Sequence, residues 1–522
     1  MQRHTPRLIL LSIVAIVAVI LLWARNSQSS APPSSPAPGT IPKPADAVEI
    51  SIIYAPEEEF YIVDAINDFN RMFAAGVNPL TGQPLAARER PIYVTGREGS
   101  SGTIHQAIVN AVIAPTVANV ERPTIYAPAS SLWLALVNYE TGQAIFDLAN
   151  SPPTAQTPVV IAIWESRLKA IQAKHGTQEI GWEELLAVMD APKGWNDYGL
   201  PGRQTVYYGH TDPYISSTGL AVLIAEFTAS AHYRAGQAAG ERLSLATVNQ
   251  PAVQQGVRDI EGMIKHYSKR TTEFVEYIAQ GPTYVDFVPL QEGDLLRITM
   301  GQTAIKPPEP LVALYPKEGT LWLEHPFAVP NTDWVTPEQR AAARVFTDYI
   351  LSEAIQKKVM ATGLRPANPK VALGYPFVKE LGVDPQPPAA VLDTPAPDVV
   401  AAVQASWQYV KKQADIVLVL DVSGSMAGDK LTQAQSAAQL FLDQLAPQNR
   451  VALVTFESTL QTVVPLGRFE SNAGQMRQAI QTLQADGGTR LFDAVEAATA
   501  SWAKMKLTAF GPFFSSPMAR HR

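Results

Sequence analysis

The chain has 522 residues, enough for two to four domains, and 46% of them are hydrophobic, so it can form substantial cores. Its 41 basic and 48 acidic residues give a net charge of −7, which provides no general electrostatic reason to bind nucleic acid. Because the sequence has no cysteine, disulfides, thiolate metal sites, iron–sulfur clusters and a cysteine nucleophile are excluded.

The N-terminus has the features of a targeting segment. Arg3 and Arg7 precede an apolar run, residues 8–24, in which Ser12 is the only polar residue. The length of this run lies between that of a secretory signal and that of a membrane-spanning helix. Because no small-x-small cleavage site follows it, we expect residues 1–25 to remain as a transmembrane anchor, with a cleaved signal as the alternative. The positive-inside rule then leaves the bulk of the protein extracytoplasmic, at the cell surface or in the periplasm.

Two proline clusters divide the rest of the chain. Residues 26–46 are rich in proline and serine and predict a semi-extended linker, and a second proline-rich linker spans residues 384–398. The predicted folded regions are therefore residues 47–383 and 399–522.

In the larger region, strand patterns alternate with helix patterns. Residues 48–54 predict a strand, and the helical spacing of Ile62, Ile66 and Phe69 predicts an amphipathic helix after it. Residues 159–164 are continuously apolar, as expected of a strand that is buried on both faces. The repeated order of strand and helix predicts an α/β fold with mostly parallel sheets.

Three predicted helix starts in this region combine small hydroxyl residues with free backbone N–H groups. Such helix starts can bind an anion or another polar ligand, although serine and threonine are also ordinary helix caps. The candidate ligand-binding residues are Ser100, Ser101, Ser130, Ser131, Ser216, Ser217 and Thr218.

Residues 45–370 resemble the extracellular solute-binding proteins of ABC importers, especially those with two α/β lobes that hold oxyanions. The matching stretches are residues 128–133, 158–164, 209–213, 311–330 and 363–366. The resemblance implies a two-lobed periplasmic-binding-protein-like (type II) domain with a small polar or anionic solute in a hinged cleft. The candidate serines and threonine would then line this cleft.

The C-terminal region contains a motif for a metal site. Residues 415–421 predict a buried strand, and Asp421, Ser423 and Ser425 follow at its carboxyl end on a tight turn. One carboxylate and two hydroxyls are hard oxygen ligands, which suits Mg²⁺ with positions open for water or a partner's carboxylate.

This pattern, with the αββα order and the Gly-Gly-Thr loop that follow it, resembles the von Willebrand factor type A (VWA) domain, a doubly wound parallel-sheet fold. By this resemblance Asp421, Ser423 and Ser425 form the first element of the metal-ion-dependent adhesion site, and Thr489 is the ligand from the second loop. The resemblance also implies a protein partner that supplies a carboxylate to the metal.

The sequence departs from the VWA pattern after residue 506. The family continues with a strand that delivers an Asp, but here no acidic residue follows Glu496, and Pro512 and Pro517 disfavour a central strand. We therefore expect a partial VWA domain that results from a premature stop or frameshift. Its Mg²⁺ binding should be weak, and its first strand should have an unpaired edge.

Two functions are compatible with these patterns, and a third is disfavoured. The first is a membrane-anchored extracytoplasmic binding protein whose two domains bind a solute and a protein partner. The second is the substrate-binding component of an ABC-type importer. An enzyme is disfavoured because HExxH, GxSxG and GxxxxGK[ST] motifs are all absent from the sequence and the eight histidines occur singly.

Overall fold

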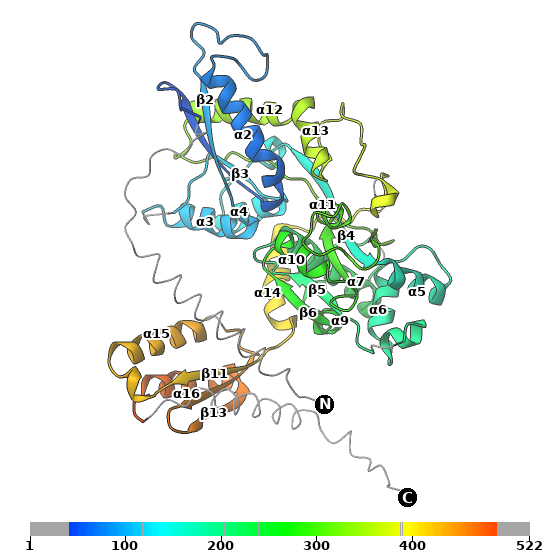
Figure 1. Cartoon of the computed structure of the whole chain (residues 1–522), viewed down its shortest axis with the longest axis vertical. Coiled ribbons are helices and arrows are strands. Elements are labelled where there is room, and N and C mark those ends of the chain that lie inside the picture. The colour runs from blue at the N-terminus through cyan, green and yellow to red at the C-terminus, as the bar shows by residue number, and fades with distance from the viewer. Residues whose placement is uncertain are drawn as a thin grey trace, which may run out of the picture.

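The computed structural model describes residues 41–116, 120–201, 204–238, 240–386, 388, 390–443 and 445–487. Three units follow one another along the long axis of the molecule: two lobes and a smaller C-terminal domain (Figure 1). Residues 1–25, predicted to be a membrane anchor, and Thr489, predicted to be a metal ligand, lie outside the described residues. None of the helices among the described residues is both long and apolar enough to span a membrane.

The first lobe is built on a three-stranded parallel sheet in the order β2-β1-β3. Helices cover this sheet, as expected from the amphipathic pattern of residues 59–74, and the apolar side chains of Ile62, Phe69 and Phe346 are fully buried against it. The strands are β1 (Val48–Tyr54), β2 (Ile92–Glu98) and β3 (Ile125–Ala127), and the helices are α2 (Glu59–Ala74), α3 (Ser101–Ile113), α4 (Leu132–Thr141), α12 (Pro337–Ile350) and α13 (Glu353–Ala361), with a short 3₁₀ helix η1 (Pro56–Glu58).

The second lobe contains a seven-stranded sheet with the path β10-β4-β7-β5-β6, on which β8 and β9 also pair with β4. Its strands are β4 (Ala155–Trp164), β5 (Tyr208–Thr211), β6 (Ile264–Ser268), β7 (Phe287–Gln291), β8 (Leu311–Leu314), β9 (Trp322–Leu323) and β10 (Arg365–Pro366). Its helices are α5 (Glu165–His175), α6 (Trp182–Met189), α7 (Ser217–Ala235), α8 (Leu245–Val248), α9 (Pro251–Gly262), α10 (Thr271–Ile278) and α11 (Glu292–Thr299).

The prediction of mostly parallel sheets is wrong for the second lobe. Strand β4 is antiparallel to all four of its partners, β7, β8, β9 and β10, and only the pairs of β5 with β6 and β7 are parallel. The predicted burial of β4 is confirmed, since its residues from Val159 to Trp164 are all buried. A continuous apolar run reports burial on both faces, and it carries no information about the direction of the neighbouring strands.

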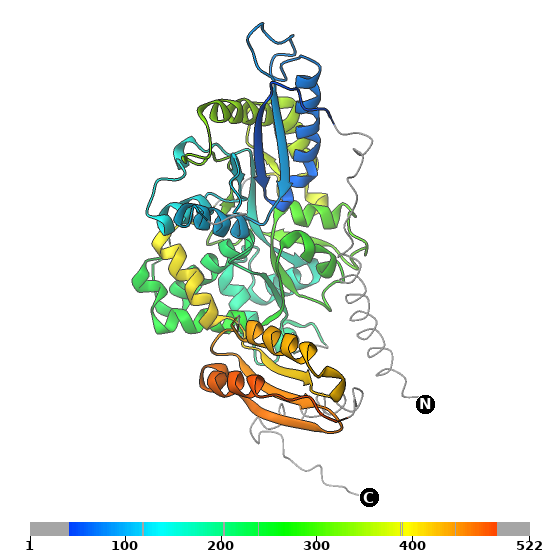
Figure 2. The same ribbon diagram turned by 90° about the vertical axis from the view of Figure 1, so that its left-hand side faces the viewer.

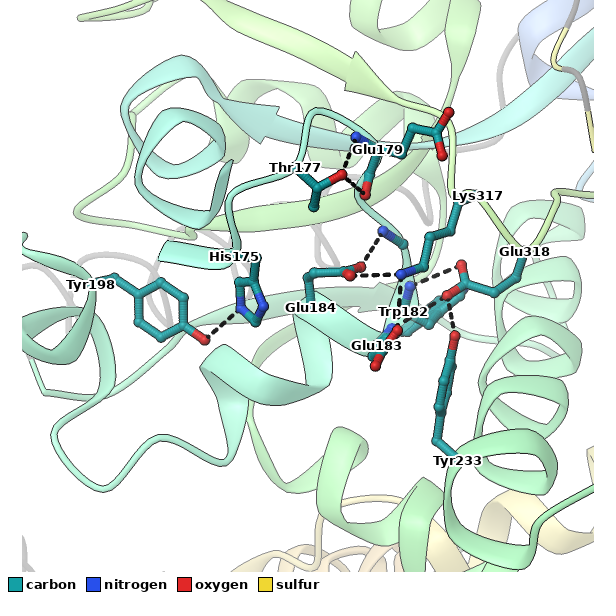
Figure 3. A network of polar contacts seen from close by, with 11 residues as sticks. His175, Thr177, Glu179, Trp182, Glu183, Glu184, Tyr198, Tyr233, Lys317 and Glu318 are labelled. Carbon is teal, nitrogen blue, oxygen red and sulfur yellow. Dashed lines mark hydrogen bonds and ion pairs between the residues drawn. The ribbon is translucent and has the colours of Figure 1, made fainter. Parts of the chain in front are cut away.

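A polar network fastens α6 to the rest of the second lobe (Figure 3). The Glu318 carboxylate accepts hydrogen bonds from the backbone N–H of Trp182, at 3.0 Å, and from the hydroxyl of Tyr233 in α7, at 2.6 Å. Lys317 forms ion pairs with Glu183 and Glu184 in the first turn of α6, at 2.9 and 2.6 Å. A carboxylate at a helix N-terminus accepts hydrogen bonds from free N–H groups and interacts favourably with the positive end of the helix dipole. This network therefore stabilises the position of α6.

Helix α14 (Pro397–Val410) joins the lobes to the C-terminal domain. Its apolar face packs into the core that contains α4, α7 and α9, and it buries Val399, Val403 and Trp407 there. The view in Figure 2 shows this yellow helix lying against the lobes, with the C-terminal domain beyond its end. The predicted boundary at residue 399 therefore differs from the packing, in which α14 belongs with the two lobes.

In the C-terminal domain, the described strands have the order β11-β12-β13, with β12 parallel to β11 and antiparallel to β13. Its elements are β11 (Asp415–Asp421), α15 (Asp429–Asp443), β12 (Arg450–Phe456), β13 (Leu460–Arg468) and α16 (Phe469–Gln481). The predicted order of elements is confirmed as far as residue 481. Strand β11 was expected to be buried, but it is only half-buried, because among the described residues it pairs with β12 alone.

Candidate functional site

A small cavity, of about 20 Å³, lies where the two lobes meet. The first lobe contributes η1 and the start of α3, and the second lobe contributes the loop before α7 and the start of α10. The lining residues are Pro56, Glu57, Ser100, Ser101, Ile215, Ser216, Ser217, Arg270, Thr271 and Thr272.

Three helices begin at this cavity, each directly after or shortly after a strand. Ser100 is the N-cap of α3 and follows β2, Ser216 is the N-cap of α7 and follows β5, and Arg270 is the N-cap of α10 and follows β6. The first N–H groups of a helix have no partner within the helix, and the helix dipole makes this end positive. The wall of the cavity is therefore rich in hydrogen-bond donors.

The structure brings together four of the seven predicted ligand-binding residues, Ser100, Ser101, Ser216 and Ser217. The hydroxyls of Ser101 and Ser217 each accept a bond, from the N–H of Ala129 at 3.1 Å and from the indole N–H of Trp133 at 2.8 Å. Because these bonds use oxygen lone pairs, the O–H groups of both serines remain able to donate to a ligand.

The other three predicted residues do not line the cavity. The Ser131 hydroxyl donates to the Glu324 carboxylate at 2.6 Å, and the Ser130 hydroxyl accepts from the N–H of Leu132 at 3.3 Å. Thr218 lies one residue further along α7 and accepts a bond from Gln291 at 3.4 Å. These hydroxyls serve as local hydrogen-bonding groups, the ordinary role of serine and threonine near helix starts.

Two charged residues of the cavity, Glu57 and Arg270, were not predicted from the sequence. Arg270 forms an ion pair with Glu98, and Gln291 donates to the carboxyl group of Glu57. Burial raises the pKa of Glu57, which favours its uncharged form. The sequence Arg270-Thr271-Thr272 before a helix is a signal of the same kind as the three that were recognised, and it could have been found.

A glycine allows the two lobes to approach each other beside the cavity. The N–H of Gly102, in the first turn of α3, donates to the carbonyl of Ile215 at 3.1 Å. A Cβ atom at Gly102 would lie 1.9 Å from the carbonyl oxygen of Tyr214, which is far closer than atoms can pack. Glycine is thus required here for close backbone contact between the lobes.

The predicted metal motif forms a compact turn after β11. The N–H of Ser423 donates to Asp421 Oδ1 at 2.8 Å, which fixes the carboxylate over the turn. The hydroxyl oxygens of Ser423 and Ser425 are 3.1 Å apart. The motif residues Asp421, Ser423 and Ser425 thus lie together, as predicted.

A second loop approaches this turn. The N–H of Gly424 donates to the carbonyl of Gly487 at 3.0 Å, and the N–H of Asp486 donates to the carbonyl of Val422 at 2.9 Å. Glu457 follows β12, and its carboxylate lies against Gly487. Asp421 and Glu457 therefore follow the carboxyl ends of two neighbouring parallel strands, where ligands bind in open α/β sheets.

The residues of this turn fit Mg²⁺. The Asp421 carboxylate and the hydroxyls of Ser423 and Ser425 are hard oxygen donors of the kind that Mg²⁺ prefers, and the two hydroxyls are joined by a hydrogen bond of 3.1 Å. Glu457 was not predicted as part of this edge, because its place depends on strand pairing.

Comparison with protein families gives two matches along the chain. The family of bacterial extracellular solute-binding proteins matches residues 106–385, more than half of the chain. The von Willebrand factor type A domain matches residues 416–509. The second match begins one residue into β11, which agrees with the packing of α14 against the lobes.

Two relatives match short parts of the chain. Inter-alpha-trypsin inhibitor heavy chain H4 of Bos taurus is 34% identical over 83 residues, 16% of this chain and 9% of that protein. An uncharacterized protein of Synechocystis sp. is 32% identical over 92 residues, 18% of this chain and 22% of that protein. The chain therefore spans less than a quarter of the length of either relative.

Solved structures that resemble the protein include three binding proteins. A periplasmic thiamin binding protein is 12% identical, with a TM-score of 0.47, and the match covers 72% of this chain and 100% of that chain. A sulfate-binding protein of Mycobacterium tuberculosis is 15% identical (TM-score 0.41; 69% and 96% covered). A ferric binding protein of Campylobacter jejuni is 10% identical (TM-score 0.44; 69% and 98% covered).

The match over residues 106–385 covers most of both lobes and includes two of the three helix starts at the cavity. The match over residues 416–509 covers β11, the turn of Asp421 and Ser423, and the second loop. The chain belongs to the family of bacterial extracellular solute-binding proteins, and a von Willebrand factor type A domain follows its solute-binding region.

Proposed function

We propose that the protein is an extracytoplasmic binding protein, anchored in the membrane by residues 1–25, that binds a small solute between its lobes and a protein partner through its VWA domain. The observation that supports this most directly is the cavity between the lobes, at which α3, α7 and α10 begin. The role we propose is binding, without catalysis.

The lining of the cavity favours a small polar solute with an anionic or strongly hydrogen-bond-accepting group. Helix N-termini and the hydroxyls of Ser101 and Ser217 can donate hydrogen bonds, and Arg270, which is paired with Glu98, also borders the cavity. Glu57 faces the same cavity, and burial raises the pKa of its carboxyl group. In this structure the cavity has a volume of only about 20 Å³, enough for little more than one water molecule, so we propose that the lobes move apart to admit a solute.

The solute prediction is tested on the full chain by thermal unfolding with a panel of oxyanions, sugars and amino acids. A solute at 100 times its dissociation constant should add about 2.7 kcal/mol to the free energy of unfolding. Ser100 lines the cavity without making a side-chain capping bond. We therefore expect Ser100→Ala to weaken solute binding roughly 2- to 10-fold, the value of one hydrogen bond, without reducing the stability of the solute-free protein.

Ser131→Ala is the matched control for this experiment. It removes a serine hydroxyl that lies at a helix start but bonds Glu324 instead of lining the cavity. The dissociation constant of the solute should be unchanged in this variant. If no solute in the panel shifts the unfolding temperature, a solute site at this cavity is contradicted. The site is also contradicted if Ser100→Ala and Ser131→Ala weaken the binding of a solute equally.

We further propose that the VWA domain binds Mg²⁺ through Asp421, Ser423 and Ser425, with Thr489 as a further ligand. The ion would supply an open coordination position for a carboxylate of the protein partner. The gathering of the Asp421 carboxylate and two hydroxyls, all hard oxygen donors, on one turn supports this assignment.

Isothermal titration of the full chain with MgCl₂ tests the metal site. Because Asp421 is the one carboxylate among the proposed ligands, we expect a weak dissociation constant, on the order of 1 mM. Asp421→Ala should abolish the binding. Asp415→Ala, at the opposite end of the same strand, should leave it intact. Equal Mg²⁺ binding by the wild type and the Asp421→Ala variant would refute the site.

The second candidate function is the substrate-binding component of an ABC-type importer for a small polar or anionic solute. The family match over residues 106–385 supports this function and the first candidate function equally. A gene for a membrane permease beside the gene for this protein would support the importer, whereas a protein partner captured in a Mg²⁺-dependent way would support the first candidate.

A further inference from the structure

A second group of polar side chains lies inside the second lobe, away from the cavity between the lobes. His210 on β5, Glu226 on α7 and Glu261 on α9 are each fully buried. One possible ligand atom from each lies within 4.8 Å of the corresponding atoms of the other two. None of the three residues lines the solute cavity.

The hydrogen bonds of His210 leave one ring nitrogen with a free lone pair. Its Nδ1 lies 2.5 Å from the carbonyl oxygen of Thr211, and because a carbonyl can only accept, Nδ1–H donates this bond. The tautomer is thus fixed with an unprotonated Nε2. This buried Nε2 atom has no hydrogen-bond partner, and it lies 3.9 Å from Glu226 Oε1.

Glu226 is also incompletely paired, whereas both carboxylate oxygens of Glu261 accept a hydrogen bond. Glu226 Oε1 accepts a bond from the Tyr208 hydroxyl at 3.0 Å, while Glu226 Oε2 is buried without a partner. Glu261 accepts bonds from the Tyr267 hydroxyl and, at 3.1 Å, from the indole N–H of Trp407. Leaving such groups without a counter-charge is costly in a protein interior.

We propose that His210, Glu226 and Glu261 bind a divalent transition-metal ion, with Zn²⁺ as the preferred ion. A divalent cation balances two carboxylates and a neutral imidazole, so the buried site becomes electrically neutral. Zn²⁺ binds both imidazole nitrogen and carboxylate oxygen at about 2.0–2.2 Å. Three atoms within 4.8 Å of one another lie at most about 2.8 Å from a common point, so small side-chain movements complete the site.

Hydrogen bonds from neighbouring groups hold the three proposed ligand side chains in place, as is usual around metal sites. The Nδ1–H of a metal-binding histidine commonly donates to a backbone carbonyl, which is the bond His210 makes to Thr211. The donors from Tyr208, Tyr267 and Trp407 orient the carboxylates in the same way. Because Trp407 belongs to α14, the bound ion would also hold the helix that leads to the VWA domain.

The test measures the metal content of the full-length protein produced in medium supplemented with ZnSO₄ and purified without chelator. Loading during synthesis is required because all three ligands are fully buried. We expect about one Zn²⁺ per chain in the wild type. His210→Gln and Glu261→Gln, which keep the approximate side-chain size, should each reduce the content at least tenfold.

Glu58→Gln is the matched control. Glu58 pairs with His325 at 3.0 Å, both are fully buried, and among the described residues no third ligand of this kind joins them. This variant should retain the wild-type Zn²⁺ content. If the wild-type protein contains no Zn²⁺, the proposal is overturned. It is also overturned if both the His210→Gln and the Glu261→Gln variants keep the wild-type Zn²⁺ content.

A spectroscopic measurement on the wild type covers the case in which the variants do not fold. Protein produced with Co²⁺ in place of Zn²⁺ should show d–d absorption bands typical of a low-coordinate site with nitrogen and oxygen ligands. A spectrum identical to that of hexaaqua Co²⁺ would show that the ion is not held by these residues, and would equally refute the site.

Discussion

Trp407→Ala is expected to lower the free energy of unfolding by about 3–5 kcal/mol, the usual cost of removing a buried tryptophan side chain. Only 6% of Trp407 is exposed, and its ring packs with Val399 and Val403 into the core shared by α4, α7 and α9. The substitution also removes the indole N–H that Glu261 accepts at 3.1 Å. Urea unfolding of the full chain, followed by tryptophan fluorescence and circular dichroism, measures the loss.

Tyr409→Ala is the control on the same helix. Tyr409 is 60% exposed, so its replacement should change the free energy of unfolding by no more than about 0.5 kcal/mol. If both substitutions in α14 had the same small effect, the helix would not be docked on the solute-binding lobes in solution. If both destabilised the protein equally, the loss would come from helix propensity instead of packing.

Trp133→Ala should have an effect of similar size and should also abolish solute binding. Trp133 on α4 is fully buried, and its indole N–H donates to the hydroxyl of Ser217, which lines the cavity. Its ring also lies close to Gly102, where α3 meets the second lobe. Removing the ring leaves a cavity in the core and frees the side chain of Ser217 to rotate. Denaturant unfolding and the solute titration together measure the two losses.

Trp133→Phe separates packing from hydrogen bonding. Phenylalanine keeps an aromatic ring in the core but cannot donate to Ser217, so the loss of stability should be smaller, about 1–3 kcal/mol. Solute affinity should still fall, because the orientation of the Ser217 hydroxyl depends on the lost bond. Unchanged affinity in this variant would show that Ser217 does not contact the solute.

Much of the local structure could be predicted from the sequence. The apolar spacing of α2, the strand at Val48–Tyr54 and the burial of β4 are all confirmed. Periodicity and helix caps depend on residues that are neighbours in the chain, so a single sequence contains these signals. The helix starts at Ser100 and Ser216 were recognised in the same way.

The pairing of distant segments could not be predicted. The direction of the partners of β4 and the packing of α14 on the lobes depend on contacts between residues more than a hundred positions apart. The same reason explains the errors about the cavity. Ser131 and Ser217 have similar sequence surroundings, but only the fold decides that Ser131 meets Glu324 while Ser217 faces the cavity.

The short connection between α14 and β11 has a mechanical consequence. Residues 411–414 span at most about 14 Å when extended, and both ends are held: Lys412 donates to the Tyr267 hydroxyl at 3.2 Å, and Ala414 donates to Asn449 at 3.1 Å. Tension applied to the VWA domain therefore passes directly into α14. Because α14 packs on α4 and α7, and the first turn of α7 lines the cavity, such tension would act on the walls of the cavity that we propose as the solute site.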